Sequence, residues 1–94
     1  MIVEISKNAD KAIEKAPINI QLIVAEQVEK LKAAHNLNEL SNVRPLKGVD
    51  EPYYKMNFGK YRLIIYYDDK TKKVDVRRFK HRKDSYKKHN LPWR

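Results

Sequence analysis

Cationic side chains recur at every second position late in this sequence. Arg78, Lys80 and Arg82 alternate along one run, and Lys55 and Arg62 lie in two earlier runs. Because neighbouring residues of a β-strand point to opposite faces, this spacing predicts that the cations gather on one face of a sheet. Cationic donors held in fixed positions can bind a phosphate and stabilise the extra negative charge that develops on it during strand cleavage. The pattern therefore predicts a surface for a polyanion.

The charge of the 94-residue chain is divided unevenly. Met1 to Asn42 carries five Lys and six acidic residues, whereas Val43 to Arg94 carries sixteen Lys or Arg and six acidic residues. Every Tyr, Phe and Trp also falls in the second segment. A solvated face would explain any one of these cations, but repulsion within a cluster favours a bound anion. Basic charge interleaved with aromatic rings that can stack on bases makes RNA the leading candidate partner.

Two helices are expected in the first half of the chain. Met1 to Ile5 is predicted to form a short strand, after which Asn8 or Asp10 can cap a helical stretch that runs to Lys15. Pro17 ends this stretch, and an amphipathic helix then reaches about Ala34. Its apolar side is predicted to contain Ile20, Val24, Val28 and Leu31, and its polar side Glu26, Gln27, Glu29 and Lys30. From His35 to Asn42 we expect a loop or single turn, anchored by Leu37 and Leu40.

Four strands are expected in the second half, because four runs rich in aromatic and β-branched residues are separated by short gaps. These runs are Val43 to Leu46, Tyr53 to Phe58, Tyr61 to Tyr67 and Lys73 to Phe79. The order predicts a single α+β domain over residues 1–94, with two helices on one face of a four-stranded, mainly antiparallel sheet. A short N-terminal strand and a short C-terminal helical turn complete it. Phe79 is out of phase with Val74 and Val76, and a bulge or the end of the strand would return it to the core.

Several classes of function are disfavoured by composition. The chain has no Cys, so it has no disulfide framework and no thiolate, and we expect neither a metal site nor a cofactor. The longest apolar stretch after Met1 is Leu22 to Ala25, far shorter than the roughly 20 residues of a membrane span. We therefore expect a soluble cytoplasmic protein with no membrane partner.

Three segments suggest a family. They are residues 43–48 (VRPLKG), residues 54–66 (YKMNFGKYRLIIY) and residues 81–86 (HRKDSY). In this order, behind two expected helices, they resemble the RelE/ParE superfamily of toxins from bacterial type II toxin–antitoxin systems. The resemblance implies a RelE-like mRNA interferase, an endoribonuclease that cuts mRNA in the ribosomal A site and is neutralised by a cognate antitoxin protein.

The resemblance also implies site residues. The RelE-type cutting set would fall on Lys55, Asn57, Arg62, Lys80, Arg82 and Tyr86. Asn57 departs from the pattern, because the ribosome-dependent cutters usually have Lys or Arg there, and Lys80 stands where some members have Arg. Further contacts to mRNA or ribosomal RNA are expected from Lys47, Asn57, Lys60, Arg78, His81, Lys83, Lys87 and Lys88.

Cleavage of RNA without a metal requires three tasks: activation of the ribose 2′-hydroxyl, stabilisation of the phosphate and protonation of the departing 5′-oxygen. Arg62, with either Arg82 or Lys80, is the choice for the phosphate. Neighbouring cations disfavour the ammonium form of Lys55, which makes it a candidate base.

Two further residues remain open in role. Tyr86 could stack on a base or polarise the 2′-hydroxyl. His81 could transfer a proton, but strand alternation points it away from Lys80 and Arg82, which favours a structural role.

Two alternatives remain at this stage. ParE-type toxins share the scaffold but inhibit DNA gyrase and lack the cutting residues, so Arg62, Arg82 and Tyr86 favour the nuclease. A non-catalytic RNA-binding module would use the basic sheet to hold phosphates only.

Overall fold

Strands and helices follow in the order that the sequence predicts, with one short turn between the two halves. The computed structural model describes residues 1–46, 48 and 52–81. The elements are β1 (Ile2–Ile5), α1 (Lys7–Glu14), α2 (Ile18–Ala33), the 3₁₀ turn η1 (Leu37–Glu39), β2 (Val43–Pro45), β3 (Tyr53–Phe58), β4 (Tyr61–Asp68) and β5 (Lys73–His81). The expected C-terminal helical turn lies outside the described residues.

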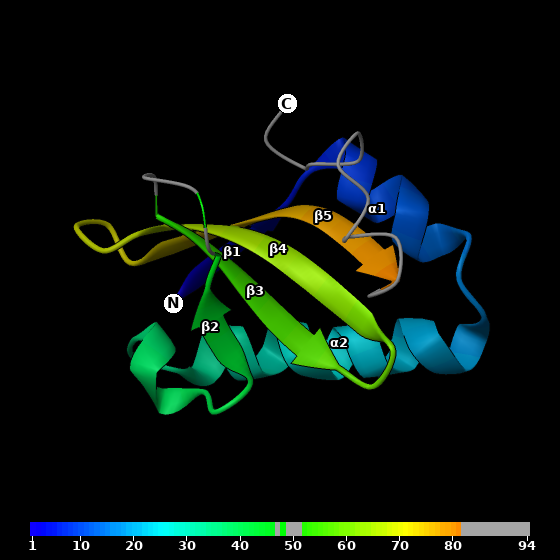
Figure 1. Ribbon diagram of the computed structural model, residues 1–94, viewed down its shortest axis with the longest axis horizontal. Coiled ribbons are helices and arrows are strands. Elements are labelled where there is room, and N and C mark those ends of the chain that lie inside the picture. Colours follow the sequence, from blue (N-terminus) through cyan, green and yellow to red (C-terminus); the bar gives the residue numbers. More distant parts are fainter. Residues whose placement is uncertain (47, 49–51, 82–94) are drawn as a thin grey trace.

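The sheet has five strands in the order β1-β5-β4-β3-β2 (Figure 1). Strands β2 to β5 pair antiparallel, as expected, whereas β1 pairs parallel to β5 from Ile2 opposite Lys73 to Ile5 opposite Val76. The sheet is therefore mixed and five-stranded, and the expectation of a four-stranded sheet beside a separate N-terminal strand is wrong. Residue pattern identifies a strand such as β1, but it does not show which distant strand supplies the ladder partners.

The core lies between the two helices and one face of the sheet. Val24, Val28 and Leu31 of α2 are buried against Met56 and Leu63 of the sheet, in one cluster of apolar side chains. Both helices therefore cover the same face, and the apolar side predicted for the second helix is confirmed. The polar side needs one correction, because Gln27 is buried as well.

The connecting segment before the sheet forms a single turn, as expected. Leu37 of η1 is buried in the core, and Leu40 packs against it. Glu39 closes the turn, because its Oε2 accepts hydrogen bonds from the backbone N–H of His35 at 2.6 Å and of Asn36 at 3.2 Å. These backbone donors favour the charged carboxylate and lower the pKa of Glu39.

The hairpin between β3 and β4 turns at two residues. Gly59 adopts a φ of 57°, in the left-handed region that suits glycine. Lys60, the other turn residue, is exposed to solvent. This tight turn fixes the register of the two strands and so decides which side chains share a face.

A bulge interrupts the pairing of β4 with β5. Ile64 lies opposite Arg78 and Ile65 lies opposite Val76, so that Arg77 is skipped in the register. The skipped residue reverses the alternation that follows and returns Phe79 to the core, where it is buried. Of the two explanations for the phase of Phe79, a bulge or the end of the strand, the structure shows the bulge.

Ser6 joins the first helix to this bulge. Its Oγ accepts a hydrogen bond from the backbone N–H of Ala9 at 3.1 Å and donates one to the carbonyl oxygen of Arg77 at 2.9 Å. The same carbonyl accepts a second hydrogen bond, from Nη1 of Arg78 at 2.9 Å. Ser6 is the N-cap of α1, so the expectation of a cap at Asn8 or Asp10 is wrong by a few residues.

We expect Ser6→Ala to lower the free energy of unfolding by about 1–2 kcal/mol, because the variant loses a helix cap and a donor to the bulge carbonyl. Urea denaturation followed by circular dichroism measures the change. Ser6→Thr keeps the hydroxyl and is the matched control, with a smaller loss. An unchanged unfolding midpoint in Ser6→Ala would show that neither hydrogen bond contributes to stability.

Candidate nucleic-acid interface

The sheet face that turns away from the helices carries the predicted cations in two rows. The first row runs across three strands, with Arg62 opposite both Asn57 and Lys80. Directly opposed residues of paired strands project to the same side, with Cβ atoms about 4.5–5.5 Å apart. Arg62, Asn57 and Lys80 are therefore neighbours on one face.

The second row lies two residues further along each strand. Ile64 stands opposite Lys55 on one side and Arg78 on the other, and Lys55 stands opposite Arg44 of β2. Strand alternation places this row on the same face as the first. We call this surface the basic face, and its residues are Arg44, Lys55, Asn57, Arg62, Arg78 and Lys80.

The guanidinium of Arg62 is held in place. Its side chain is only 4% exposed, and its Nε donates a hydrogen bond to Oδ1 of Asn57 at 2.9 Å. Burying a cation costs free energy unless hydrogen bonds compensate for its lost hydration. The hydrogen bond to Asn57 therefore also restrains the Arg62 side chain. Asn57, the departure from the expected pattern, thus supplies a neutral acceptor that orients Arg62.

His81 lies on the opposite face of the sheet. It pairs with Tyr61, and the two rings meet edge-on with their centroids 5.4 Å apart. Tyr61 and Phe79 lie against the helix-covered core. His81 therefore lies on the face opposite Lys80, as strand alternation predicted, and its expected contact with RNA stays a prediction.

The remaining predicted residues divide into two groups. Lys60 is exposed at the turn between β3 and β4, at the end of the basic face where Arg62 and Asn57 lie. The other group falls outside the described residues, and its members stay predictions from the sequence. They are Lys47, Arg82, Lys83, Tyr86, Lys87 and Lys88.

Comparison with known proteins supports the fold at the level of structure. No protein-family model matches the sequence, and a search of curated proteins finds no match. A chain of the toxin–antitoxin complex RelBE2 from Mycobacterium tuberculosis superposes with a TM-score of 0.71 at 26% identity, covering 86% of this chain and 96% of that one. A chain of the archaeal RelE–RelB complex from Pyrococcus horikoshii OT3 gives 0.72 at 26% identity, covering 86% and 93%.

A third structure agrees. A chain of the RelB–RelE antitoxin–toxin complex from Methanococcus jannaschii gives a TM-score of 0.72 at 24% identity, covering 87% of this chain and 93% of that one. The fold is that of RelE-like toxins. The resemblance noted in the sequence is confirmed at the level of the RelE-like fold, with two helices packed on one sheet, whereas the mixed, five-stranded form of that sheet was not predicted.

A polar network behind the basic face of this RelE-like fold was missed at the level of sequence. Nδ2 of Asn42 donates to Oε1 of Gln27 at 3.0 Å and to the carbonyl oxygen of Asn57 at 2.9 Å. The backbone N–H of Asn57 in turn donates to the carbonyl oxygen of Asn42 at 3.0 Å. The network fixes Asn57, and so Arg62, to helix α2. Helical spacing gives one signal, because Gln27 falls between Val24, Val28 and Leu31 on the buried side.

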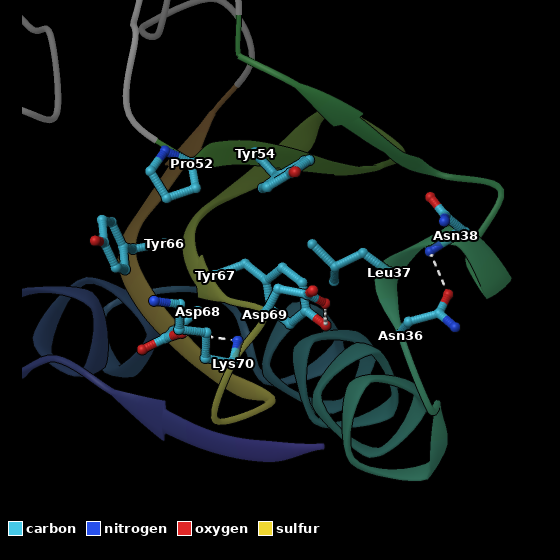
Figure 2. A pocket seen from close by; sticks show the side chains of 10 residues that line it. All are labelled: Asn36, Leu37, Asn38, Pro52, Tyr54, Tyr66, Tyr67, Asp68, Asp69 and Lys70. Carbon is cyan, nitrogen blue, oxygen red and sulfur yellow. Dashed lines mark hydrogen bonds between the residues drawn. The ribbon is translucent and has the colours of Figure 1, made fainter.

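A cleft of about 590 Å³ lies at the other end of β4 in this RelE-like fold (Figure 2). Tyr54, Tyr67 and Leu37 lie around it, and the loop carboxylates Asp68 and Asp69 also line it. A phosphate would be repelled by these two carboxylates. This cleft is therefore unsuited to a polyanion, and the basic face remains the candidate interface.

Tyr67 and Asp69 form a structural pair at this cleft. The hydroxyl of Tyr67 donates to Oδ1 of Asp69 at 3.0 Å, and Nζ of Lys72 lies 2.9 Å from the same oxygen. Burial raises the pKa of the Tyr67 phenol, whereas the hydrogen bond from Lys72 lowers the pKa of Asp69. The phenol thus stays a donor and the carboxylate stays an acceptor over the neutral range.

Residues 1–46, 48 and 52–81 contain neither a group of side chains for a metal ion nor a membrane-spanning helix. No three His, Asp or Glu side chains are grouped there in a way that could hold a metal ion. The helices of the same residues are too short or too polar to cross a membrane.

Proposed function

We propose that this protein is the toxin of a type II toxin–antitoxin pair and that it cuts mRNA in the ribosomal A site without a metal ion. One observation carries the proposal: strand register brings Lys55, Arg62 and Lys80, three residues of the expected cutting set, onto one face of a RelE-like fold. The similar structures are toxin–antitoxin complexes, which supports a cognate antitoxin as protein partner. Translating ribosomes and mRNA, the other proposed partners, place its action in the cytoplasm.

The reaction that suits this set of groups is attack by the ribose 2′-hydroxyl on the adjacent phosphate. The 2′-oxygen bonds to phosphorus, the bond from phosphorus to the 5′-oxygen breaks, and a 2′,3′-cyclic phosphate and a 5′-hydroxyl result. A base removes the 2′ proton and an acid protonates the departing 5′-oxygen. Every atom comes from the RNA and from side-chain protons, so no cofactor is needed.

Roles within the site follow from placement and charge. Arg62, oriented by Asn57, is proposed to hold the phosphate and stabilise its added negative charge, with Lys80 beside it across the strand pair. Lys55 of the second row is the proposed base. Arg82 and Tyr86 are proposed from the sequence as a second phosphate contact and as the group that stacks on a base or polarises the 2′-hydroxyl.

Induction in cells, followed by mapping of RNA 5′ ends, tests the proposal. We expect cuts in a translated message and none in the same message with its start codon removed, because the ribosome presents the substrate. Arg62→Ala is the inactive control. DNA damage without RNA cuts would instead indicate a gyrase inhibitor, and neither effect would leave a non-catalytic RNA binder.

A further inference from the structure

The basic face continues into an aromatic row beyond its two rows of cations. Tyr66 follows Ile64 by two residues on β4, so it projects from the same face, and it stands opposite Tyr53 and Asp75. The ring of Tyr53 meets the ring of Tyr66 edge-on, with centroids 5.2 Å apart. The aromatic row lies about 13 Å from the row of Arg62, at four residues of strand rise.

The bulge in β5 adds an arginine to this row. Arg77 is the residue skipped in the register, and its Cζ lies 5.1 Å from the centroid of the Tyr66 ring. Arg78, the next residue, lies opposite Ile64 on the basic face. Two successive arginines thus reach the face that holds Arg62, an arrangement that regular alternation would forbid. Bulges often re-aim a side chain in this way next to functional sites.

The position of Arg77 is fixed from two sides. Its carbonyl oxygen accepts hydrogen bonds from Ser6 Oγ and Arg78 Nη1, and its Nη2 lies 3.6 Å from Oδ2 of Asp75. Nevertheless, its side chain is 41% exposed. A planar cation held over a tyrosine ring and still open to solvent is a surface on which a nucleobase can stack.

The negative charge of Asp75 distinguishes the aromatic row from the proposed phosphate site at Arg62. The carboxylate of Asp75 lies beside Arg77 and also 4.0 Å from Nζ of Lys73, so a phosphate gains less here than beside Arg62. A neutral base bears no such penalty, because stacking depends on the planar surface. We propose that Tyr66 and Arg77 form a stacking subsite for a base that flanks the scissile phosphate. This inference rests on the proposed function for its ligand, RNA.

An abasic scan tests the subsite. Ribosomes are programmed with a message that carries 2′-deoxyribose at the cut position, so that the message cannot be cleaved. In a series of such messages, one base at a time is removed around that position. We expect the full-length native protein to bind about tenfold more weakly when one flanking base is missing. Tyr66→Ala and Arg77→Lys should bind the intact message about tenfold more weakly and become insensitive to loss of that same base.

The test variant Arg77→Lys keeps the charge but loses the planar guanidinium. Two other variants are the controls. Tyr66→Phe keeps the aromatic ring and should retain the native pattern. Lys15→Ala removes an exposed cation from the helix side and should also retain it. Equal sensitivity of native protein and Tyr66→Ala to every missing base would overturn the subsite, as would a native protein that shows no position dependence.

Two further measurements distinguish failure of the proposed function from failure of the subsite. The same scan on a free single-stranded oligonucleotide, together with a cleavage assay on an all-ribose message, separates stacking from cutting. A native protein that stacks without cutting would refute the nuclease and support the subsite. A double variant, Tyr66→Ala with Arg77→Ala, that cuts as fast as the native protein would refute the subsite and support the nuclease.

Discussion

Arg62→Ala should relieve growth arrest and slow the cutting of translated message by at least about a hundredfold. Removal of one preorganised donor from a site of developing negative charge commonly costs 10²–10³ in rate, about 3–4 kcal/mol. The loss is expected because Arg62 is oriented by its hydrogen bond to Asn57, so its guanidinium needs little reorientation when the phosphate arrives. The rate is measured from the appearance of new 5′ ends on programmed ribosomes.

Controls for this variant must separate chemistry from folding, because Arg62 is buried. Arg44→Ala removes the same kind of side chain from the same face, at the exposed edge strand, where Arg44 Nη1 bonds to the carbonyl oxygens of Ser41 and Val43. We expect Arg44→Ala to lose little activity. Arg62→Lys keeps the charge but loses the planar fork, and it should restore only part of the rate. A folded Arg62→Ala protein with full toxicity would contradict the assignment.

Local pattern predicted much of this fold because most of its elements are specified by short-range periodicity. Val24, Val28 and Leu31 at helical spacing are buried on α2, and the alternation in β3 and β4 separates Asn57 and Arg62 from the core. The bulge was one of the two ways in which the sequence allowed Phe79 to reach the core. These features depend on which residues are neighbours along one or two elements.

Features that depend on contacts distant in sequence were not predicted. Nothing in Ile2 to Ile5 indicates that β1 pairs parallel with β5, and the hydroxyl of Ser6 is a helix cap whose second partner is 71 residues away. The contribution of Asn42 and Gln27 to the site was not predicted for the same reason, because it depends on a side-chain hydrogen bond between loop and helix. Such pairings become visible only when the elements are packed.

The candidate site shows the same division. Alternation placed Lys55, Arg62 and Lys80 on one face, but it gave no reason for Asn57 to stand where a cation was expected. The hydrogen bond from Arg62 Nε to Asn57 Oδ1 supplies that reason, since a second cation at this point could not accept it. The departure at Asn57 therefore changes how the guanidinium is held and keeps the face suited to phosphate.

Leu22→Asp is expected to weaken binding of the antitoxin at least about thirtyfold while it leaves the cutting rate unchanged. Helix α2 presents large apolar side chains to solvent, with Ile18 71% and Leu22 63% exposed. Leu22, Ala25 and Ala33 line a shallow apolar groove with Glu29 and other charged residues at its rim. Exposed apolar surface bordered by charge is typical of a protein interface, and the proposed antitoxin is the partner that this function requires.

The size of the effect follows from desolvation. A charge placed where an apolar anchor is buried loses the contact and must also be stripped of water, which commonly costs 2 kcal/mol or more at the centre of an interface. Asn38→Asp adds the same charge at an exposed position of η1 and is the matched control. Co-expression with the antitoxin, followed by growth and by affinity of the purified pair, gives the measurement. Full neutralisation of Leu22→Asp by the antitoxin would show that the groove at Leu22 lies outside the interface.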